Sequence, residues 1–284
     1  MVVTAPSAAR TEVNDVVRGA CGGMLFGIPL LYTVEVWWIG SVTHPARLLF
    51  VLAVVFFLVL LLNRTSGFRT MKDASIADAA KDSVEAMAIG LIMVTVVLVL
   101  IREITIDSPL RQALGKIVYE ATPFTIGVAL AGQFLRRGRA PDGDEEGGGK
   151  SAFEATIADV GATLLGAVFV ASAIAPTDEV PLITTAMRAP WILAIVGLSL
   201  LVSYAIVFEA GFADQEQRKA QDGYIQHPVT ETLFCYLLAL LAALAMLWFF
   251  QRWEPGDPLD LVLQQTLVLG LPAAIGGAAG RLAV

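Results

Sequence analysis

Charged residues are scarce in this sequence. Asp, Glu, Lys and Arg make up 16% of the 284 residues, whereas 56% are hydrophobic. Soluble domains have about 25% charged and about 45–50% apolar residues, so a soluble fold of this length could not remove so much apolar surface from water. The mean hydropathy of +0.71 and the grouping of apolar residues into long blocks indicate a polytopic membrane protein.

Cysteine and histidine are scarcer still. Cys21 and Cys235 both lie in apolar blocks, which argues against a disulfide framework. His44 and His227 are too few for a His/Cys metal cluster. The basic residues are dispersed among acidic ones, and neither a GxSxG nor an HExxH motif is present. We therefore expect no metal, no cofactor, no nucleic-acid partner and no enzymatic activity.

Long hydrophobic runs are what the sequence has instead. Eight segments have about the 17–25 residues that a helix needs to cross the hydrocarbon core. Lipid offers the backbone no hydrogen-bond partners, so such segments form helices. We predict an all-α transmembrane helix bundle with spans at Val17–Gly40, Arg47–Leu62, Val84–Ile101, Ile117–Leu135, Phe153–Ala175, Trp191–Phe208, Thr230–Phe250 and Leu259–Leu282.

Basic residues favour one side of this topology. Six of the 19 Lys and Arg residues lie on the side opposite the termini, and the others lie on the side of the termini. The six are Arg47, Arg102, Arg111, Lys116, Arg188 and Arg252. Positively charged loops stay in the cytoplasm, so we predict a multi-pass protein whose two termini are both cytoplasmic.

Residues 136–152 interrupt the apolar pattern with the polar, glycine-rich stretch RRGRAPDGDEEGGGK. Such a composition is typical of a flexible linker. It separates residues 1–135 from residues 153–284, and each part holds four predicted spans. The two parts can be aligned so that Glu85 matches Glu231 and Pro123 matches Pro272. We predict two parallel four-helix repeats, an arrangement found in some transporters.

Glycines recur at helical spacing in the first and last spans. Gly19, Gly23 and Gly27 fall on one helix face, and Gly276 and Gly280 repeat the spacing. Faces of small residues let helix backbones approach closely in lipid. We predict that these five glycines pack helix against helix.

Prolines interrupt three spans. Pro29, Pro123 and Pro272 lack an N–H group and should bend their helices. Interrupted helices with freed carbonyls build midplane sites in transporters. The alternative is a packing kink whose freed carbonyl is satisfied by a neighbouring helix.

Two stretches carry polar side chains inside predicted spans. Glu35 follows Tyr32 and Thr33, which could add hydroxyl ligands, and precedes Trp37 and Trp38. A carboxylate there could draw cations into a pathway. The alternative is a residue wetted by headgroup water beside an interfacial tryptophan belt.

Glu120 is the sharper candidate. It stands beside Tyr119 and Thr122, three residues before Pro123, and an ionisable group in lipid is costly unless it faces a polar interior. Asp159 near the start of the fifth span is a weaker candidate. Solvation near the membrane interface is the alternative for both carboxylates.

The first span resembles, through the run G-x-L-F-G-I-P-L-L-Y-T-x-E-x-W-W that ends at Trp38, a family of uncharacterised bacterial integral membrane proteins. The resemblance implies a multi-pass protein of the bacterial inner membrane. It assigns no activity and no role to any residue.

Kinked spans, a repeat and the carboxylates Glu35 and Glu120 in the outer half of the membrane favour a membrane transport protein. It would be a cation channel or a proton-coupled transporter. The permeant species would be an inorganic cation or a proton, and the lipid bilayer would be the surrounding partner. The glycine faces leave two other arrangements open, a homo-oligomer and a structural or assembly role in a membrane complex. A membrane-embedded enzyme is less favoured, because no nucleophile–base spacing supports it.

Overall fold

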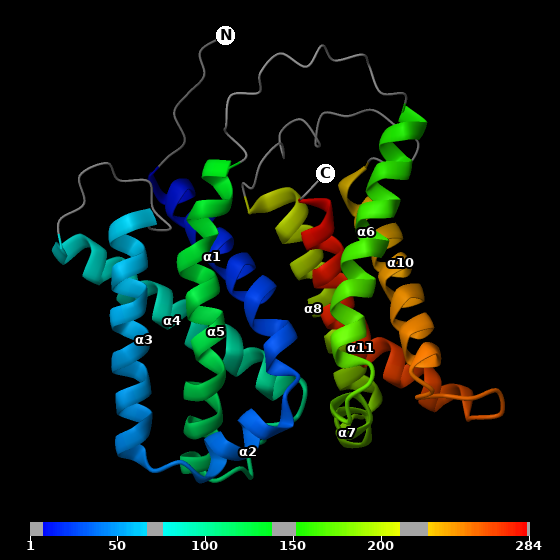
Figure 1. The fold of residues 1–284 in the computed structure, drawn as a ribbon, viewed down its shortest axis with the longest axis horizontal. Coiled ribbons are helices and arrows are strands. Elements are labelled where there is room, and N and C mark those ends of the chain that lie inside the picture. The colour runs from blue at the N-terminus through cyan, green and yellow to red at the C-terminus, as the bar shows by residue number, and fades with distance from the viewer. Residues whose placement is uncertain (1–7, 67–75, 138–151, 211–226, 283–284) are drawn as a thin grey trace.

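The computed structural model describes residues 8–66, 76–137, 152–210 and 227–282, which form helices joined by short connections (Figure 1). The helices of the first half are α1 (Ala8–Leu31), α2 (Val34–Val42), α3 (Pro45–Ser66), α4 (Ile76–Leu100) and α5 (Leu110–Arg137). Those of the second half are α6 (Ala152–Ile174), α7 (Glu179–Ala186), α8 (Ala189–Tyr204), the π-helical turn η1 (Ala205–Glu209), α10 (Pro228–Phe249) and α11 (Leu259–Arg281). The predicted all-α fold is confirmed.

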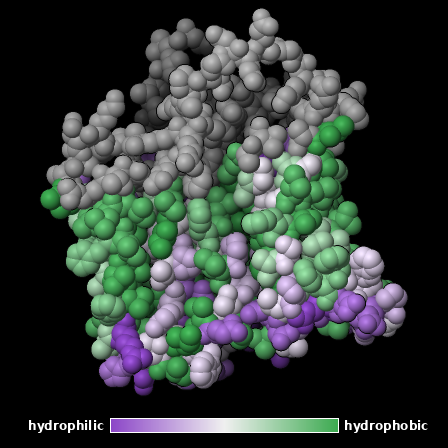
Figure 2. Space-filling model, viewed as in Figure 1, coloured by the Kyte–Doolittle hydropathy of each residue, from purple (hydrophilic) through white to green (hydrophobic). Residues whose placement is uncertain are grey.

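Helix α1 begins and α11 ends on the same side of the bundle, which we call the terminal side, while α2 and α7 lie on the opposite side (Figure 1). Apolar side chains cover the visible flank of the bundle, and polar ones gather along the edge opposite the terminal side (Figure 2). This distribution is the one that a bilayer requires, because lipid contacts the middle of the bundle and water contacts its rim.

Five helices are long and apolar enough to cross a membrane, and the number rises to seven if the pairs α1–α2 and α6–α7 each form one bent span. Helix α5, which contains Lys116 and Glu120, lies outside this set, although it crosses the bundle in contact with α1. The count of eight spans therefore stays a prediction. Most of the predicted linker, residues 138–151, lies outside the described residues, since α5 continues to Arg137 and α6 begins at Ala152.

The first predicted span, Val17–Gly40, is wrong as a single helix. Helix α1 passes through Pro29 and ends at Leu31, and α2 starts again at Val34 after a bend of 91°. Thr33 between them has an extended backbone, with φ −143°. The break is stabilised by tertiary contacts, because the carboxylate of Glu179 on α7 accepts a hydrogen bond from the Val34 N–H at 3.1 Å. A carboxylate at this position also suits the positive end of the α2 dipole.

The second half repeats this geometry. The pair α6–α7 is bent by 86°, and each half continues with three further helices. In each half the first and last helices pack most extensively, α1 against α5 and α6 against α11. Their backbones touch at glycines: a Cβ atom on Gly127 would lie 2.4 Å from the carbonyl oxygen of Gly22, and one on Gly166 would lie 2.1 Å from that of Gly276. Larger residues cannot occupy these crossings without separating the helices.

The glycines predicted from spacing lie at the same two crossings. Gly19, Gly23 and Gly27 face α5, where their neighbours are Phe124 and Val128. Gly276 and Gly280 face α6, at Gly166 and Ala162. The glycine faces are therefore occupied by helices of the same chain.

Hydrogen bonds from side chains join the two halves at two places, the middle of α1 and the residue just after its end. On the terminal side, Nε of Arg18 donates to the carbonyl oxygen of Ala210 at 3.0 Å. On the opposite side, the hydroxyl of Tyr32 donates to the carbonyl oxygen of Val268 at 2.9 Å. That carbonyl lies four residues before Pro272, which has no N–H to donate to it. The carbonyl oxygen freed by Pro272 is thus bonded by Tyr32, which lies between α1 and α2.

Candidate functional sites inside the bundle

Glu120 is the most isolated charged side chain in the first half. It lies on α5, about 15 Å from the start of the helix at 1.5 Å per residue, and only 1% of its surface is exposed. Within the described part of the chain, its Oε1 atom has no hydrogen-bond partner. Burying an ionised carboxyl without a counter-charge is costly, so packing alone does not explain a glutamate here.

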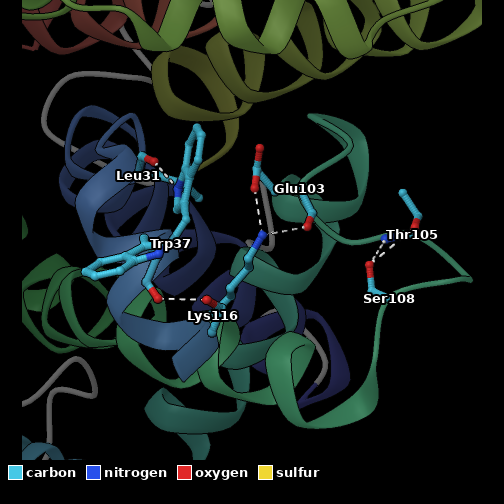
Figure 3. A network of polar contacts seen from close by, with 8 residues as sticks. Leu31, Trp37, Glu103, Thr105, Ser108 and Lys116 are labelled. Atoms are coloured by element: carbon cyan, nitrogen blue, oxygen red, sulfur yellow. Dashed lines mark hydrogen bonds and ion pairs between the residues drawn. The ribbon is translucent and has the colours of Figure 1, made fainter. Parts of the chain in front are cut away.

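Lys116, which is placed to pair with Glu120, contacts Glu103 instead. Lys116 lies four residues earlier on α5, a spacing at which side chains can pair. Its Nζ atom instead contacts Oε2 of Glu103 at 2.8 Å and the carbonyl oxygen of Glu103 at 3.0 Å (Figure 3). Glu120 also lies on the face of α5 that carries Phe124 and Gly127, and both of these residues contact α1. The carboxyl is therefore on the side of α5 that packs against α1 and α2, with no cation from its own helix.

Glu35 has a different environment from Glu120. It is exposed in the first turn of α2, so it does not continue the α1 axis as predicted. The predicted tryptophan belt is half right: Trp38 is exposed, but Trp37 is buried. The indole N–H of Trp37 donates to the carbonyl oxygen of Leu31 at 2.8 Å (Figure 3). Because α1 ends at Leu31, this carbonyl lacks a helical partner, and Trp37 supplies one.

The remaining polar candidates of the first half do not gather around Glu35. The buried hydroxyl of Tyr32 is bonded to Val268, and Thr33 holds the N-cap position of α2 without a side-chain capping bond. The hydroxyl of Tyr119 lies 3.4 Å from that of Thr43, and Thr122 is half-buried on α5. These residues serve helix ends and helix contacts, and they form no common ligand set.

A second cluster of charges lies in the second half, on the terminal side. Arg281 in the last turn of α11 is 1% exposed and forms an ion pair with Glu231 on α10. Its Nε atom is 3.7 Å from Oδ1 of Asp159 on α6, and its Nη1 atom is 3.5 Å from the sulfur of Cys235. The guanidinium also lies 5.9 Å from the ring centroid of Phe208 in η1. One cation thus joins four elements of the second half.

A small cavity adjoins this cluster. It encloses about 250 Å³ of space between atoms, its open mouth included, and its enclosed part accommodates about one water-sized occupant. We call it the α11 cavity; it is lined by Thr163, Ser203, Val207, Thr232, Cys235, Tyr236, Ala274, Ala278 and Arg281. The lining comes from α6, α8, η1, α10 and α11, and a π-helical turn such as η1 often marks a functional site.

Comparison with known families identifies the chain. The sequence profile of a family described as "putative integral membrane protein (DUF2391)" matches residues 15–284. The chain belongs to this family. No curated protein and no solved structure matches it.

Membership of the DUF2391 family establishes an integral membrane protein, in agreement with the predicted resemblance and with the candidate spans. The matched residues include Glu120 and the whole α11 cavity. The family description names no activity, so any function has to be argued from these sites. In the described part of the chain, no group of three or more His, Cys, Asp or Glu residues could hold a metal ion.

Sequence analysis missed the role of two charged residues. The sequence comparison matches Glu231 to Glu85 and counts Arg281 among the basic residues on the side of the termini, and it assigns neither of them a partner. The sequence does contain a sign of this ion pair, namely an arginine in the last turn of a glycine-rich apolar helix. A buried guanidinium requires a carboxylate partner. Asp159, which was a predicted candidate, does contact this arginine.

Proposed function

We propose that this DUF2391 protein is a membrane transport protein for protons or small inorganic cations, and that Glu120 is the carboxyl on its pathway. The observation that carries the proposal is a glutamate that is buried in a membrane bundle and whose Oε1 atom has no hydrogen-bond partner among the described residues. Intramembrane carboxyls in such positions are typical of ion and proton pathways. A carboxyl that alternates between a protonated and an ion-bound state could bias two packings of the surrounding helices.

The neighbourhood of Glu120 supports this role. Pro123 lies three residues later and cannot donate to the carbonyl oxygen of Tyr119. One turn of α5 therefore combines a buried carboxyl with a carbonyl that lacks its helical partner. Transporters build ion sites from interrupted helices of this kind.

The matching order of helices in the two halves supports such a mechanism. The two halves share one order of helices, with bends of 91° and 86° at corresponding places, and we infer that they form a parallel repeat. The bias of basic residues towards the terminal side supports an inner-membrane protein with cytoplasmic termini. In a parallel repeat, the two halves can rock against each other around their interface.

An assembly role has less support. It was expected to rest on glycine faces that would bind a partner helix. Those faces contact α5 and α6 of the same chain. The described helices thus reserve no glycine stripe for a second protein.

Ion flux into proteoliposomes tests the proposal. We expect purified protein to carry protons or a monovalent cation faster than protein-free vesicles, and Glu120→Gln to reduce this flux at least tenfold. Glu35→Gln is the matched control, because it makes the same chemical change at an exposed position and should keep the flux. Equal flux in wild type and Glu120→Gln, or no flux from folded protein, would reject the proposal.

A further inference from the structure

We propose that Glu179 is a second proton-carrying carboxyl of the transport pathway, and that this pathway runs through the break between α1 and α2. The inference rests on the transport function proposed above and narrows its permeant species to the proton. Three observations carry it: Glu179 is buried, it contacts the other half of the bundle, and Glu120 adjoins the same break.

Glu179 is buried with only one of its two carboxyl oxygens bonded. It lies in the first turn of α7 and is 5% exposed. Its Oε1 atom accepts the hydrogen bond from the Val34 N–H, whereas in the described part of the chain its Oε2 atom has no hydrogen-bond partner. Buried polar atoms are normally bonded, so packing alone does not explain the position of Oε2.

The surroundings of the two oxygens favour different charge states of the Glu179 carboxyl. The Val34 N–H and the positive end of the α2 dipole stabilise the ionised form, whereas burial of Oε2 without a partner disfavours it. When Oε2 takes up a proton, an O–H bond forms there, the negative charge disappears, and Oε1 still accepts from Val34. A proton needs one carboxyl oxygen, whereas a dehydrated metal ion needs several oxygen ligands. The geometry of Glu179 therefore suits a proton.

Glu120 adjoins the same break from α5. Before the break, Gly27 of α1 lies against the ring of Phe124. After the break, Gly40 of α2 lies against the backbone of Lys116. Glu120 is four residues from each of these two α5 positions and shares their helix face. It therefore faces the stretch of chain between the two glycines, which contains the break.

Two buried carboxyls, one from each half, thus flank one interrupted helix. Transporters build ion sites at interruptions of this kind. Both α2 and α7 lie on the side of the bundle opposite the terminal side (Figure 1), so Glu179 is the nearer of the two carboxyls to that face of the membrane. Proton uptake by Glu179 also weakens a bond between the halves, which links the proton to their packing.

The basic side chains on either side of Glu179 contact other groups. Asp178, the residue before it, pairs with Arg252 at 2.9 Å, and Lys116 is bonded to Glu103. Among the described residues, no cation forms an ion pair with Glu179. The other charged residues of the surrounding elements are Arg18 of α1, Glu35 of α2, Arg102 after α4, Arg188 before α8 and Asp260 of α11.

Proton flux in proteoliposomes with an entrapped pH indicator tests this role. We expect Glu179→Gln to lower the flux at least about tenfold, because a positioned proton-transfer group contributes this much or more. Glutamine keeps an oxygen for the Val34 N–H but cannot take up a proton. Glu35→Gln is the matched control, since it makes the same change in the first turn of α2 at an exposed position and should keep the flux. Unchanged flux in Glu179→Gln beside a loss in Glu120→Gln would overturn the inference and leave the transport function intact.

Labelling with dicyclohexylcarbodiimide tests the same carboxyl without transport. This apolar reagent reacts with a protonated carboxyl: the proton moves to a carbodiimide nitrogen, the carboxyl oxygen adds to the central carbon, and an acyl shift gives a stable N-acylurea. We expect mass spectrometry to find the adduct on Glu179, in an amount that falls as the pH rises. If Glu179→Gln does not fold, this measurement on the wild type carries the test.

The two measurements separate the inference from the function on which it rests. Folded wild-type protein with no adduct on Glu179 at any pH would overturn the inference, whatever the flux. A pH-dependent adduct without any flux would retain Glu179 as a proton-binding carboxyl and reject the transport function.

Discussion

Two buried glutamates, Glu120 in the first half of the bundle and Glu231 in the second, have opposite environments. In the first half, Glu120 has no partner among the described residues, and the nearby Lys116 is held by Glu103. In the second half, Glu231 is bonded to Arg281, which also attracts Asp159. A paired carboxylate inside a membrane bundle can be explained by architecture. A buried carboxylate without a partner has an electrostatic cost that packing does not offset, which is why we propose a function for Glu120.

The comparison also shows how each half handles a proline. Pro272 in α11 leaves the carbonyl of Val268 without a helical donor, and Tyr32 from the other half supplies one. Pro123 in α5 stands beside Glu120 instead. The carbonyl freed by Pro272 thus takes part in a bond between the two halves, whereas the carbonyl freed by Pro123 lies next to Glu120.

The largest effect is expected from Arg281→Met. The change leaves Glu231 buried without its cation, and breaking a buried pair costs about 3–5 kcal/mol. We expect poor yield and a strongly lowered melting temperature in detergent. Adding Glu231→Gln to Arg281→Met should restore much of the loss. If the double variant is no more stable than the single one, Arg281 acts through packing and not through charge.

Glutamine substitution at Glu120 and at Glu231 tests the comparison directly. Glu231→Gln weakens the contact with Arg281 and should lower stability by about 1–3 kcal/mol. Glu120→Gln removes an unpaired carboxyl and should leave the melting temperature unchanged or raised. Thermal unfolding of the two variants side by side measures this difference. Equal destabilisation would mean that Glu120 has a structural partner after all, and the contrast between the halves would be lost.

A smaller effect is expected from Tyr32→Phe. Without the hydroxyl, the Val268 carbonyl stays unsatisfied, at a cost of about 1–2 kcal/mol. In a Pro272→Ala background the new N–H of residue 272 can bond this carbonyl, so the same change should cost less. A double-mutant cycle on melting measurements gives the coupling. Independent, additive effects of the two changes would show that Tyr32 does not compensate the proline.

Some features were predictable because they depend on local pattern. The apolar blocks predicted α3, α4, α8, α10 and α11 as spans, since hydropathy is a sum over neighbouring residues. Glycine spacing predicted the faces of α1 and α11 that meet α5 and α6. For Glu120 the sequence left two alternatives open, a site in a polar interior and solvation near the interface, and the structure buries its side chain.

Other features were not predictable because they depend on which partner a freed backbone group finds in the folded chain. The first span was predicted as one helix, but Glu179, 145 positions away, bonds the backbone where α2 starts. Trp37 has the pattern of an interfacial residue, yet it turns inward to satisfy the end of α1. In both cases a backbone group freed by the break after α1 decided the outcome, and its partner lies 145 positions away for Val34 and six positions away for Leu31.

The sequence by itself determined that this chain forms a helical bundle in a membrane. Its composition and periodicity fix the free-energy cost of exposing each segment to water or to lipid. Tertiary structure decided which polar groups meet. Arg281 and Glu231 are 50 positions apart, and Tyr32 and Val268 are 236 apart. Hydrogen bonds and close ion pairs form over a few ångströms, so only the folded arrangement reveals that Glu231 is paired with Arg281 and that Glu120 has no partner among the described residues.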